Sequence, residues 1–231
     1  MSLTRTDLES NLLQKLVLQS GLGLRVLTEA QLQESIRETL RRQLPNSDVW
    51  LFAYGSLIWN PIFRFVEHRV DTIYGWHRRF CLWTPLGRGT PDNPGLVLGL
   101  DRGGSCRGIA FRISAADVLS ELLLVWRREM VVGSYIPRWV RLVDGTEAIA
   151  FVVNRCHSGY ADNVSLETTV NSIATASGEL GSCSDYLMQT VNGLMTVGIK
   201  DKQLLLLRDQ VIARQRSLFS IEQQCSYTDG A

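Results

Sequence analysis

The sequence predicts an α+β protein in which a barrel or strongly bent sheet is flanked by helices. Three observations predict this fold class. Apolar residues recur at helical spacing before residue 46, short apolar runs punctuated by glycine follow from residue 49, and helical patterns return after residue 165. Helices, then strands with one embedded helix, then helices again, are the element order of an α+β fold rather than of alternating βα units.

Residues 1–45 are predicted to form a helical N-terminal extension. An apolar residue recurs every fourth position in two segments, at Leu8, Leu12 and Leu16 and again at Leu32, Ile36, Leu40 and Leu44. Glycines at 21 and 23 separate the segments, and the polar stretch 45–48 ends the second. We therefore expect two amphipathic helices packed on a main domain that covers residues 46–231.

The strands are predicted to begin at Val49. The run from Val49 to Tyr54 is continuously apolar and stops at Gly55, which is typical of a buried central strand that ends in a sharp turn. Further strand-like runs lie at residues 70–74, 79–83, 96–100 and 106–113. Glycines punctuate these runs, so we expect many short strands with corners that bend the sheet into a barrel.

One helix is predicted over residues 114–130, with Ser114 as its N-cap and Asp117 at the third helical position. Two more strands are expected at residues 135–143 and 147–153, joined by a turn at Asp144-Gly145. Helical patterns at 165–177, 184–195 and 200–217 complete the chain.

The charge balance limits the classes of partner. The 231 residues hold 24 Lys and Arg against 23 Asp and Glu, for a net charge of +1, so the chain lacks the basic field that binds nucleic acid. No segment reaches the about 18 apolar residues of a membrane span, and the N-terminus is acidic where a signal peptide is apolar. We expect a cytoplasmic protein that acts on a small molecule, without a nucleic-acid or membrane partner.

The cysteines and histidines predict neither disulfides nor a metal site. The five cysteines are odd in number and include no CxxC pair, which is typical of thiols in a reducing compartment. His68, His77 and His157 are too scattered to indicate a metal site or a catalytic triad. These residues therefore indicate no metal site.

Glu129 is the candidate catalytic residue. On a helical wheel the apolar side chains of this segment share one arc: Val118, Leu119, Leu122, Val125, Trp126 and Met130. Glu129 falls in the middle of that arc, whereas Arg127 and Arg128 fall outside it. A carboxyl group shielded from water has a raised pKa, which suits general acid–base catalysis near neutral pH. The alternative is that the helix ends before Glu129, or that Glu129 pairs with an arginine.

Two glycine-containing loops are candidate binding sites. Gly55, in the stretch Tyr54-Gly55-Ser56-Leu57, lets the backbone turn and leaves amide N–H groups outside the strand ladder, where they suit an anion or an oxyanion. Arg88, between Gly87 and Gly89, is a candidate for a substrate carboxylate. The alternatives are an ordinary turn and a simple loop.

The motifs together resemble the γ-glutamylcyclotransferase superfamily in its ChaC branch, over about residues 48–200. The matching stretches occur in family order: Tyr54-Gly55-Ser56-Leu57 with Trp59-Asn60-Pro61, Gly75-Trp76-His77-Arg78 with Phe80-Cys81-Leu82, Gly87-Arg88-Gly89-Thr90 with Pro94-Gly95, Trp126-Arg127-Arg128-Glu129-Met130, the residues Tyr135, Pro137 and Trp139, and Asp185-Tyr186-Leu187. Ala53 departs from the pattern, because many members have glycine there.

The resemblance implies a small mixed β-barrel with flanking helices, and the cleavage of glutathione to 5-oxoproline and Cys-Gly without metal or cofactor. It places the catalytic glutamate at Glu129, the substrate-cradling loop at residues 54–57, and a substrate-proximal tyrosine at Tyr186. Two alternatives stay open: a cyclotransferase for other γ-glutamyl amines or amino acids, and a non-catalytic binding domain on the same fold. The oligomeric state is also open.

Overall fold

The computed structural model describes residues 3–228, which form two compact units. The first consists of the described residues up to Leu82 together with Leu98–Asp162. The second consists of Trp83–Val97 together with the described residues from Asn163 onward. No helix in this described part of the chain combines the length and the apolar character that crossing a bilayer requires.

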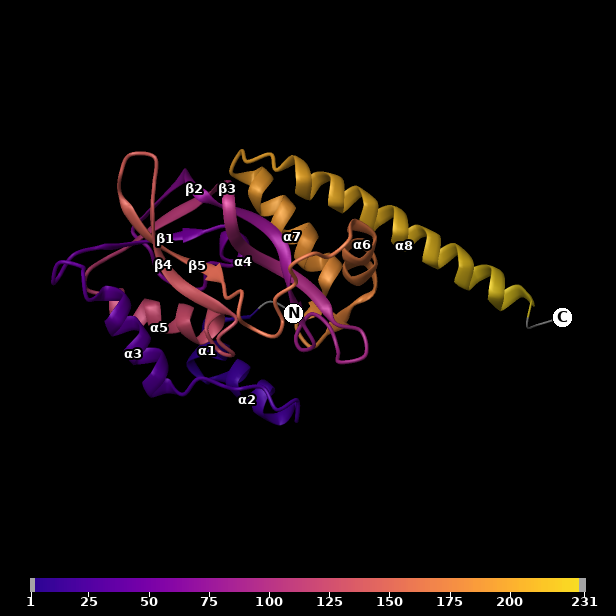
Figure 1. The fold of residues 1–231 in the computed structure, drawn as a ribbon, viewed down its shortest axis with the longest axis horizontal. Coiled ribbons are helices and arrows are strands. Elements are labelled where there is room, and N and C mark those ends of the chain that lie inside the picture. Colours follow the sequence, from indigo (N-terminus) through magenta and orange to yellow (C-terminus); the bar gives the residue numbers. More distant parts are fainter. Residues whose placement is uncertain (1–2, 229–231) are drawn as a thin grey trace. The chain divides into compact units, whose positions relative to one another are not determined.

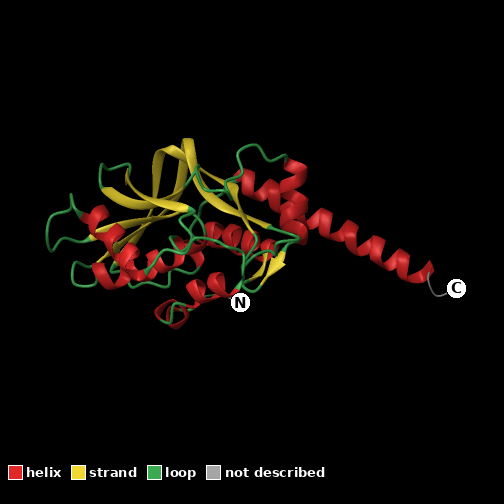
Figure 2. Cartoon of the chain, turned by 60° about the horizontal axis from the view of Figure 1, so that its bottom comes forward, coloured by secondary structure: helices red, strands yellow, loops and turns green. Residues whose placement is uncertain are grey.

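A mixed five-stranded sheet is built around strand β1 (Val49–Ala53). β1 pairs antiparallel with β3 (Gly95–Ile113) and parallel with β5 (Glu147–Val153), and the strand order is β2-β3-β1-β5-β4, with β2 at Glu67–Thr84 and β4 at Tyr135–Arg141. The sheet curls into a half-barrel (Figure 2). The predicted α+β class is confirmed, and the apolar run at Val49 is the buried central strand that its composition predicts.

The prediction of many short strands is wrong for β2 and β3. These strands run through 18 and 19 residues without interruption. Gly75 in β2 and Gly103 in β3 have φ angles of 82° and 100°, which other residues rarely adopt. These glycines therefore lie inside two long strands instead of ending several short ones.

Helix α5 (Val118–Glu129) begins four residues later than predicted, and Ser114 is not its N-cap. The Asp48 carboxylate accepts the Ala115 N–H at 2.9 Å, and the Asp117 N–H bonds to the Ser114 carbonyl at 2.8 Å. Residues 114–117 therefore form a turn that leads from β3 into the helix. The helix packs on β5 through Trp126 and Phe151, whose ring centroids lie 4.8 Å apart.

Three helices precede the sheet where the pattern predicted two. They are α1 (Arg5–Glu9), α2 (Leu12–Gln19) and α3 (Glu29–Leu40), and they lie on the same side of the sheet as α5 (Figure 1). The first predicted helix is broken at Asn11, whose φ is 57°. Leu44 does not continue the apolar stripe of the second helix, because α3 ends at Leu40 and Leu44 is 77% exposed. The domain boundary after residue 45 stays a prediction.

The second unit is mainly helical. It contains α6 (Leu166–Thr175), α7 (Cys183–Thr196) and α8 (Lys202–Thr228), close to the predicted positions, although α8 continues beyond the predicted end at residue 217. A short hairpin of β6 (Ser177–Gly178) and β7 (Gly181–Ser182) was not predicted. The Arg214 Nε donates to the Asn171 Oδ1 at 2.7 Å and so ties α8 to α6.

Candidate active site

The loop after β1 is held by its first residue, Tyr54. The buried Tyr54 hydroxyl donates to the Phe151 carbonyl at 2.8 Å. The buried Arg78 side chain donates to the Tyr54 carbonyl and, at 2.6 Å, to the Arg107 carbonyl. Tyr54 is thus anchored at both its side chain and its backbone, so the position of the loop relative to the sheet is fixed.

The loop leads directly into the one-turn helix α4 (Ser56–Trp59), with Gly55 at the N-cap position. Leu57 and Ile58 are buried, which seats this helix in the core of the first unit. The first N–H groups of any helix have no partner inside the helix and point outward from its N-terminus. The start of α4 is therefore held in a fixed position, and binding of a ligand by the N–H groups of the 54–57 loop stays a prediction.

Glu129 is the last residue of α5, and its side chain is only 14% exposed. Burial raises the pKa of its carboxyl group, and the nearby Arg128 charge opposes part of that rise, so the pKa lies above its ordinary value. The Arg128 Nε lies 3.2 Å from the Glu129 Oε1. A shielded carboxyl group is what the apolar periodicity predicts, and a contact with an arginine is what the alternative predicts.

The two arginines before Glu129 do not turn toward solvent as the helical wheel predicts. The Arg128 side chain is only 7% exposed, and Arg127 is covered because it pairs with Glu29 of α3 at 2.6 Å. Conversely, Leu119 lies on the predicted apolar arc but is 66% exposed. The wheel assumes one buried face, whereas α5 is covered by the sheet on one side and by the N-terminal helices on another.

Arg128 links Glu129 to the glycine loop. While its Nε faces the Glu129 carboxylate, its Nη1 donates to the carbonyl of Asn60, immediately after α4, at 2.8 Å. The Asn60 N–H in turn bonds to the Ser56 carbonyl at 2.9 Å. The structure therefore brings Glu129 and the 54–57 loop together within the first unit. The sequence analysis allowed a pair between Glu129 and an arginine but did not identify Arg128 as a site residue; its position beside Glu129 was the available signal.

A second carboxylate on α5 has the opposite environment. Glu121 is 1% exposed and accepts both Arg5 Nη atoms, at 2.7 and 2.9 Å, as well as the Arg64 N–H at 2.9 Å. Burial raises the pKa of Glu121, but these hydrogen bonds outweigh it and the pKa is lowered. Glu121 is therefore held ionised, whereas Glu129 binds a proton more readily. The opposite shifts of the two pKa values mark Glu121 as a structural carboxylate and Glu129 as the acid–base candidate.

The remaining two predicted site residues lie in the second unit and contact each other. The Arg88 guanidinium lies 5.7 Å from the ring centroid of Tyr186 and donates to the Ser182 carbonyl at 3.2 Å. Tyr186 is buried in α7. Gly87, before Arg88, has a φ of 85°, which explains a glycine at this position.

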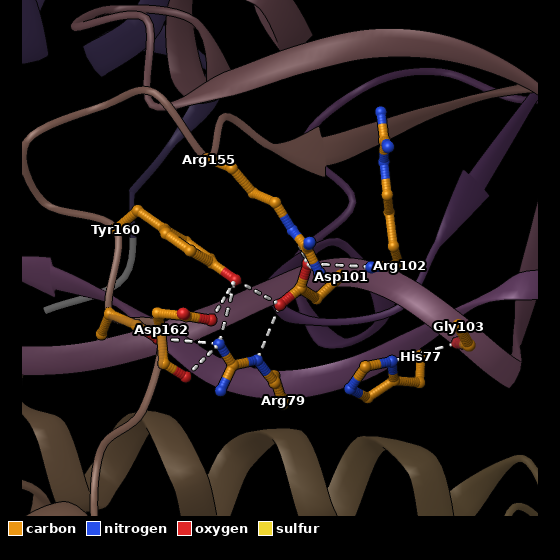
Figure 3. Close-up of polar contacts among 9 residues, drawn as sticks. His77, Arg79, Asp101, Arg102, Gly103, Arg155, Tyr160 and Asp162 are labelled. Carbon is orange, nitrogen blue, oxygen red and sulfur yellow. Dashed lines mark hydrogen bonds and ion pairs between the residues drawn. The ribbon is translucent and has the colours of Figure 1, made fainter.

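A further charged cluster, around Asp101, lies in the first unit (Figure 3). The buried Asp101 carboxylate accepts from Arg79 at 2.8 Å, from Arg155 at 2.7 Å, from the Tyr160 hydroxyl at 2.9 Å and from the Arg102 N–H at 2.8 Å. Burial raises the pKa of Asp101, but these donors outweigh it and hold the pKa at about 2. With four donors on its oxygens, Asp101 serves as a structural connection between β2, β3 and the segment after β5.

Two of the buried thiols, those of Cys81 and Cys183, are poor nucleophiles. Burial raises the pKa of Cys81 to about 12 and that of Cys183 to about 11, so both stay protonated near neutral pH.

Of the histidines, His77 contacts the Gly103 carbonyl at 3.0 Å. Among residues 3–228, no three His, Cys, Asp or Glu side chains are grouped to hold a metal ion.

Comparison with protein families agrees with the motifs. A family model described as ChaC-like protein matches residues 49–214. The chain belongs to the ChaC-like family. The match begins at β1 and includes the 54–57 loop, Glu129, Arg88 and Tyr186, whereas helices α1 to α3 lie outside it.

Curated relatives of this ChaC-like chain carry enzyme names. A glutathione-specific γ-glutamylcyclotransferase of Escherichia coli (strain K12) is 39% identical over 174 residues, which cover 74% of this chain and 75% of the relative. The glutathione-specific γ-glutamylcyclotransferase 1 of Homo sapiens is 28% identical over 73% of this chain and 83% of its own. A solved structure of a yeast γ-glutamyl cyclotransferase specific to glutathione has the same fold, with a TM-score of 0.65, 20% identity, and coverage of 73% of this ChaC-like chain and 97% of the yeast chain.

Proposed function

We propose that this chain is a glutathione-specific γ-glutamylcyclotransferase that converts glutathione to 5-oxoproline and Cys-Gly. Membership in the ChaC-like family and the names of the relatives support the substrate. The observation that carries the proposal is the shielded Glu129 carboxyl group, with its raised pKa, joined through Arg128 to the end of the glycine loop.

The reaction needs a proton carrier but no external nucleophile. The α-amine of the glutamyl residue attacks its own γ-carbonyl carbon, a five-membered ring closes, and the bond to the cysteine nitrogen breaks. One proton must leave the attacking amine and one must reach the departing amine. In the proposal, ionised Glu129 takes the first proton as a general base and returns it to the Cys-Gly amine as a general acid. A raised pKa suits both halves of this cycle.

The 54–57 loop is proposed to bind the substrate through its backbone. In the proposal, N–H groups at the start of α4 bind either the glutamyl carboxylate or the oxyanion that forms on the γ-carbonyl oxygen. Removal of one oxyanion donor typically costs about 3 kcal/mol of transition-state stabilisation. Because ring closure is intramolecular, holding the glutamyl chain bent also contributes strongly to the rate.

Arg88 and Tyr186 are proposed as further substrate-binding residues. Their support is the family resemblance, and the contact between the Arg88 guanidinium and the Tyr186 ring. A planar guanidinium suits recognition of a carboxylate, of which glutathione has two. Arg88→Gln is expected to raise the KM for glutathione more than it lowers kcat.

We also propose that the protein acts in the cytoplasm. Cys81, Cys156 and Cys183 are free thiols, which agrees with a reducing compartment.

A second candidate is a cyclotransferase for other γ-glutamyl compounds. A relative from Arabidopsis thaliana, 30% identical over 71% of this chain and 88% of its own, is named γ-glutamylcyclotransferase 2-3 without reference to glutathione. A panel of glutathione, γ-glutamyl amino acids and γ-glutamyl amines separates the candidates. Release of 5-oxoproline from glutathione alone supports the first, and faster release from the other compounds replaces it with the second.

The deciding experiment measures 5-oxoproline release from glutathione by the wild type and by Glu129→Gln. The matched control is Glu38→Gln, which makes the same change at an exposed position on α3. We expect near-complete loss of activity in Glu129→Gln, full activity in the control, and little loss of melting temperature in either. Substantial activity in Glu129→Gln would refute Glu129 as the acid–base group. A non-catalytic binding domain is the conclusion if the wild type releases no 5-oxoproline from any compound of the panel.

A further inference from the structure

The N-terminal helices lie outside the stretch that the family model matches, yet the N-terminal segment contacts α5, which carries Glu129, and the residue that follows α4. α1 contacts α5 through Arg5 and Glu121, and the segment before it contacts Asn60, the residue that follows α4. Figure 1 shows α1 beside α5. These contacts lie within the first unit, as do Glu129 and the 54–57 loop.

The contact between Arg5 and Glu121 is a two-point clamp. Both Nη atoms of Arg5 meet both carboxylate oxygens of Glu121, at 2.7 and 2.9 Å, and the Glu121 side chain is almost completely buried. The same carboxylate accepts the Arg64 N–H, at the end of the segment that follows the glycine loop. A bidentate pair fixes orientation as well as distance. Arg5 therefore orients the Glu121 carboxylate, and that carboxylate holds the segment between α4 and β2 through the Arg64 N–H.

Asn60 makes the corresponding connection at the other end of α5. Its side-chain Nδ2 donates to the Leu3 carbonyl at 2.8 Å, and its own carbonyl accepts from Arg128 at 2.8 Å. Arg127 adds a contact with α1, because its Nη1 donates to the carbonyl of Leu8 at 3.3 Å. The residues around α1 therefore bind α5 near both Glu121 and Glu129.

We propose that Arg5 is a positioning residue for the cyclotransferase reaction: by clamping Glu121 it keeps α5 aligned with the glycine loop, so that Glu129 meets the substrate amine. This inference rests on the proposed function. Glu121 and Glu129 are eight residues apart on one helix, about 12 Å along its axis, so a rotation or shift of α5 at Glu121 reaches Glu129. A misplacement of about 1 Å in a catalytic constellation costs up to about 100-fold in rate.

The test compares Arg5→Gln with Arg5→Lys and with the control Arg37→Gln. Arg37 forms an exposed ion pair with Glu34 within α3, so its loss removes an ion pair without touching α5. Each variant is assayed with glutathione well below its melting temperature. We expect Arg5→Gln to lower kcat about tenfold or more with a less than threefold change in KM, Arg5→Lys to recover part of kcat, and Arg37→Gln to match the wild type.

A purely structural role for Arg5 predicts a different result. In that case Arg5→Gln melts at a lower temperature but keeps the kcat and the pH profile of the wild type, which would overturn the proposal. If Arg5→Gln does not fold, Arg5→Lys carries the test, because lysine keeps the charge but not the two-point geometry. A wild-type kcat in folded Arg5→Lys would then count against the proposal.

A readout that needs no activity separates failure of this inference from failure of the proposed function. The difference in stability between the wild type and Glu129→Gln varies with pH according to the pKa of Glu129. Measured with and without Arg5→Gln, the midpoint of this dependence should shift if Arg5 positions the end of α5. An unchanged midpoint would overturn the inference about Arg5, whether or not the wild type is active. Failure of the wild type to release 5-oxoproline would count only against the proposed function.

Discussion

The Nε of Arg128 lies 3.2 Å from the Oε1 of Glu129, and both side chains are largely shielded from water in the last turn of α5. The pKa of Glu129 is therefore the result of two opposing effects: burial raises it and the Arg128 charge lowers it. A carboxyl group buried without a nearby positive charge would stay protonated near neutral pH and would be unable to act as a base. Arg128 thus makes the pKa of Glu129 lower than burial alone would make it.

Removal of the Arg128 charge should shift the pH dependence of catalysis. In Arg128→Met the pKa of Glu129 rises further, so the acid limb of kcat/KM should move to higher pH. Arg128→Lys, which keeps the charge, should leave the limb near its wild-type position. The measurement is the pH–rate profile with glutathione, with Arg37→Met as the control. An acid limb that stays in place in Arg128→Met would contradict the electrostatic role.

Glu129→Gln should change how stability depends on pH. Because the folded pKa of Glu129 is raised, the folded state holds this proton more tightly than the unfolded state, and wild-type stability falls as pH rises above the ordinary glutamate pKa. The glutamine variant has no carboxyl group to lose a proton, so its stability relative to the wild type should increase as pH rises above the ordinary glutamate pKa. Urea denaturation at several pH values checks this, and parallel curves for the two proteins would show that Glu129 ionises as in water.

Asp101→Asn should destabilise the protein by about 3 kcal/mol at neutral pH, because Arg79 and Arg155 lose their shared charge partner. The folded pKa of Asp101 is about 2, below the ordinary value near 3.9, so its contribution is fully present above about pH 4 and is lost as pH falls toward 2. The difference in unfolding free energy between wild type and variant should shrink over that interval. A difference that is independent of pH would argue against a paired, ionised Asp101.

Substitution of all five cysteines should leave the chemistry intact. Cys81 and Cys183 have raised pKa values and lie buried, so neither supplies a thiolate near neutral pH. Alanine suits the buried positions, because serine would place a hydroxyl group there. The side chain of Cys225 lies outside the described residues. In a folded variant we expect a kcat for 5-oxoproline release close to that of the wild type; loss of activity on Cys81→Ala alone, without unfolding, would point to a thiol mechanism.

Local patterns predicted the features that depend on neighbouring residues. The continuous apolar run predicted β1 and the turn at Gly55, and the helical period predicted that Glu129 is shielded. The length of β2 was not predictable in the same way, because a glycine that ends a strand and a glycine such as Gly75 that lies inside one look alike in sequence.

Long-range ion pairs lay beyond the reach of those patterns. Arg5 and Glu121 are separated by 116 positions, and only the folded chain brings them together. The burial of Arg127 and Arg128 was unpredictable for the same reason. A helical wheel shows one apolar face of a helix, but it does not show which other helices pack against the remaining faces. Glu121 lies beside the apolar arc. Its neighbours in the sequence do not show whether its carboxylate is buried in an ion pair or exposed to water.

The position of Glu129 as the final residue of α5 has an electrostatic consequence of its own. The aligned peptide dipoles of a helix place about half a negative charge at its C-terminus. A carboxylate there is repelled by the carbonyl end of its own helix, so α5 favours the protonated form of Glu129 in addition to the effect of burial. Arg127 and Arg128, in the same last turn, are attracted by that helix end and stabilise it. The C-terminus of α5 therefore acts as a local electric field that favours uptake of the proton from the substrate amine by Glu129.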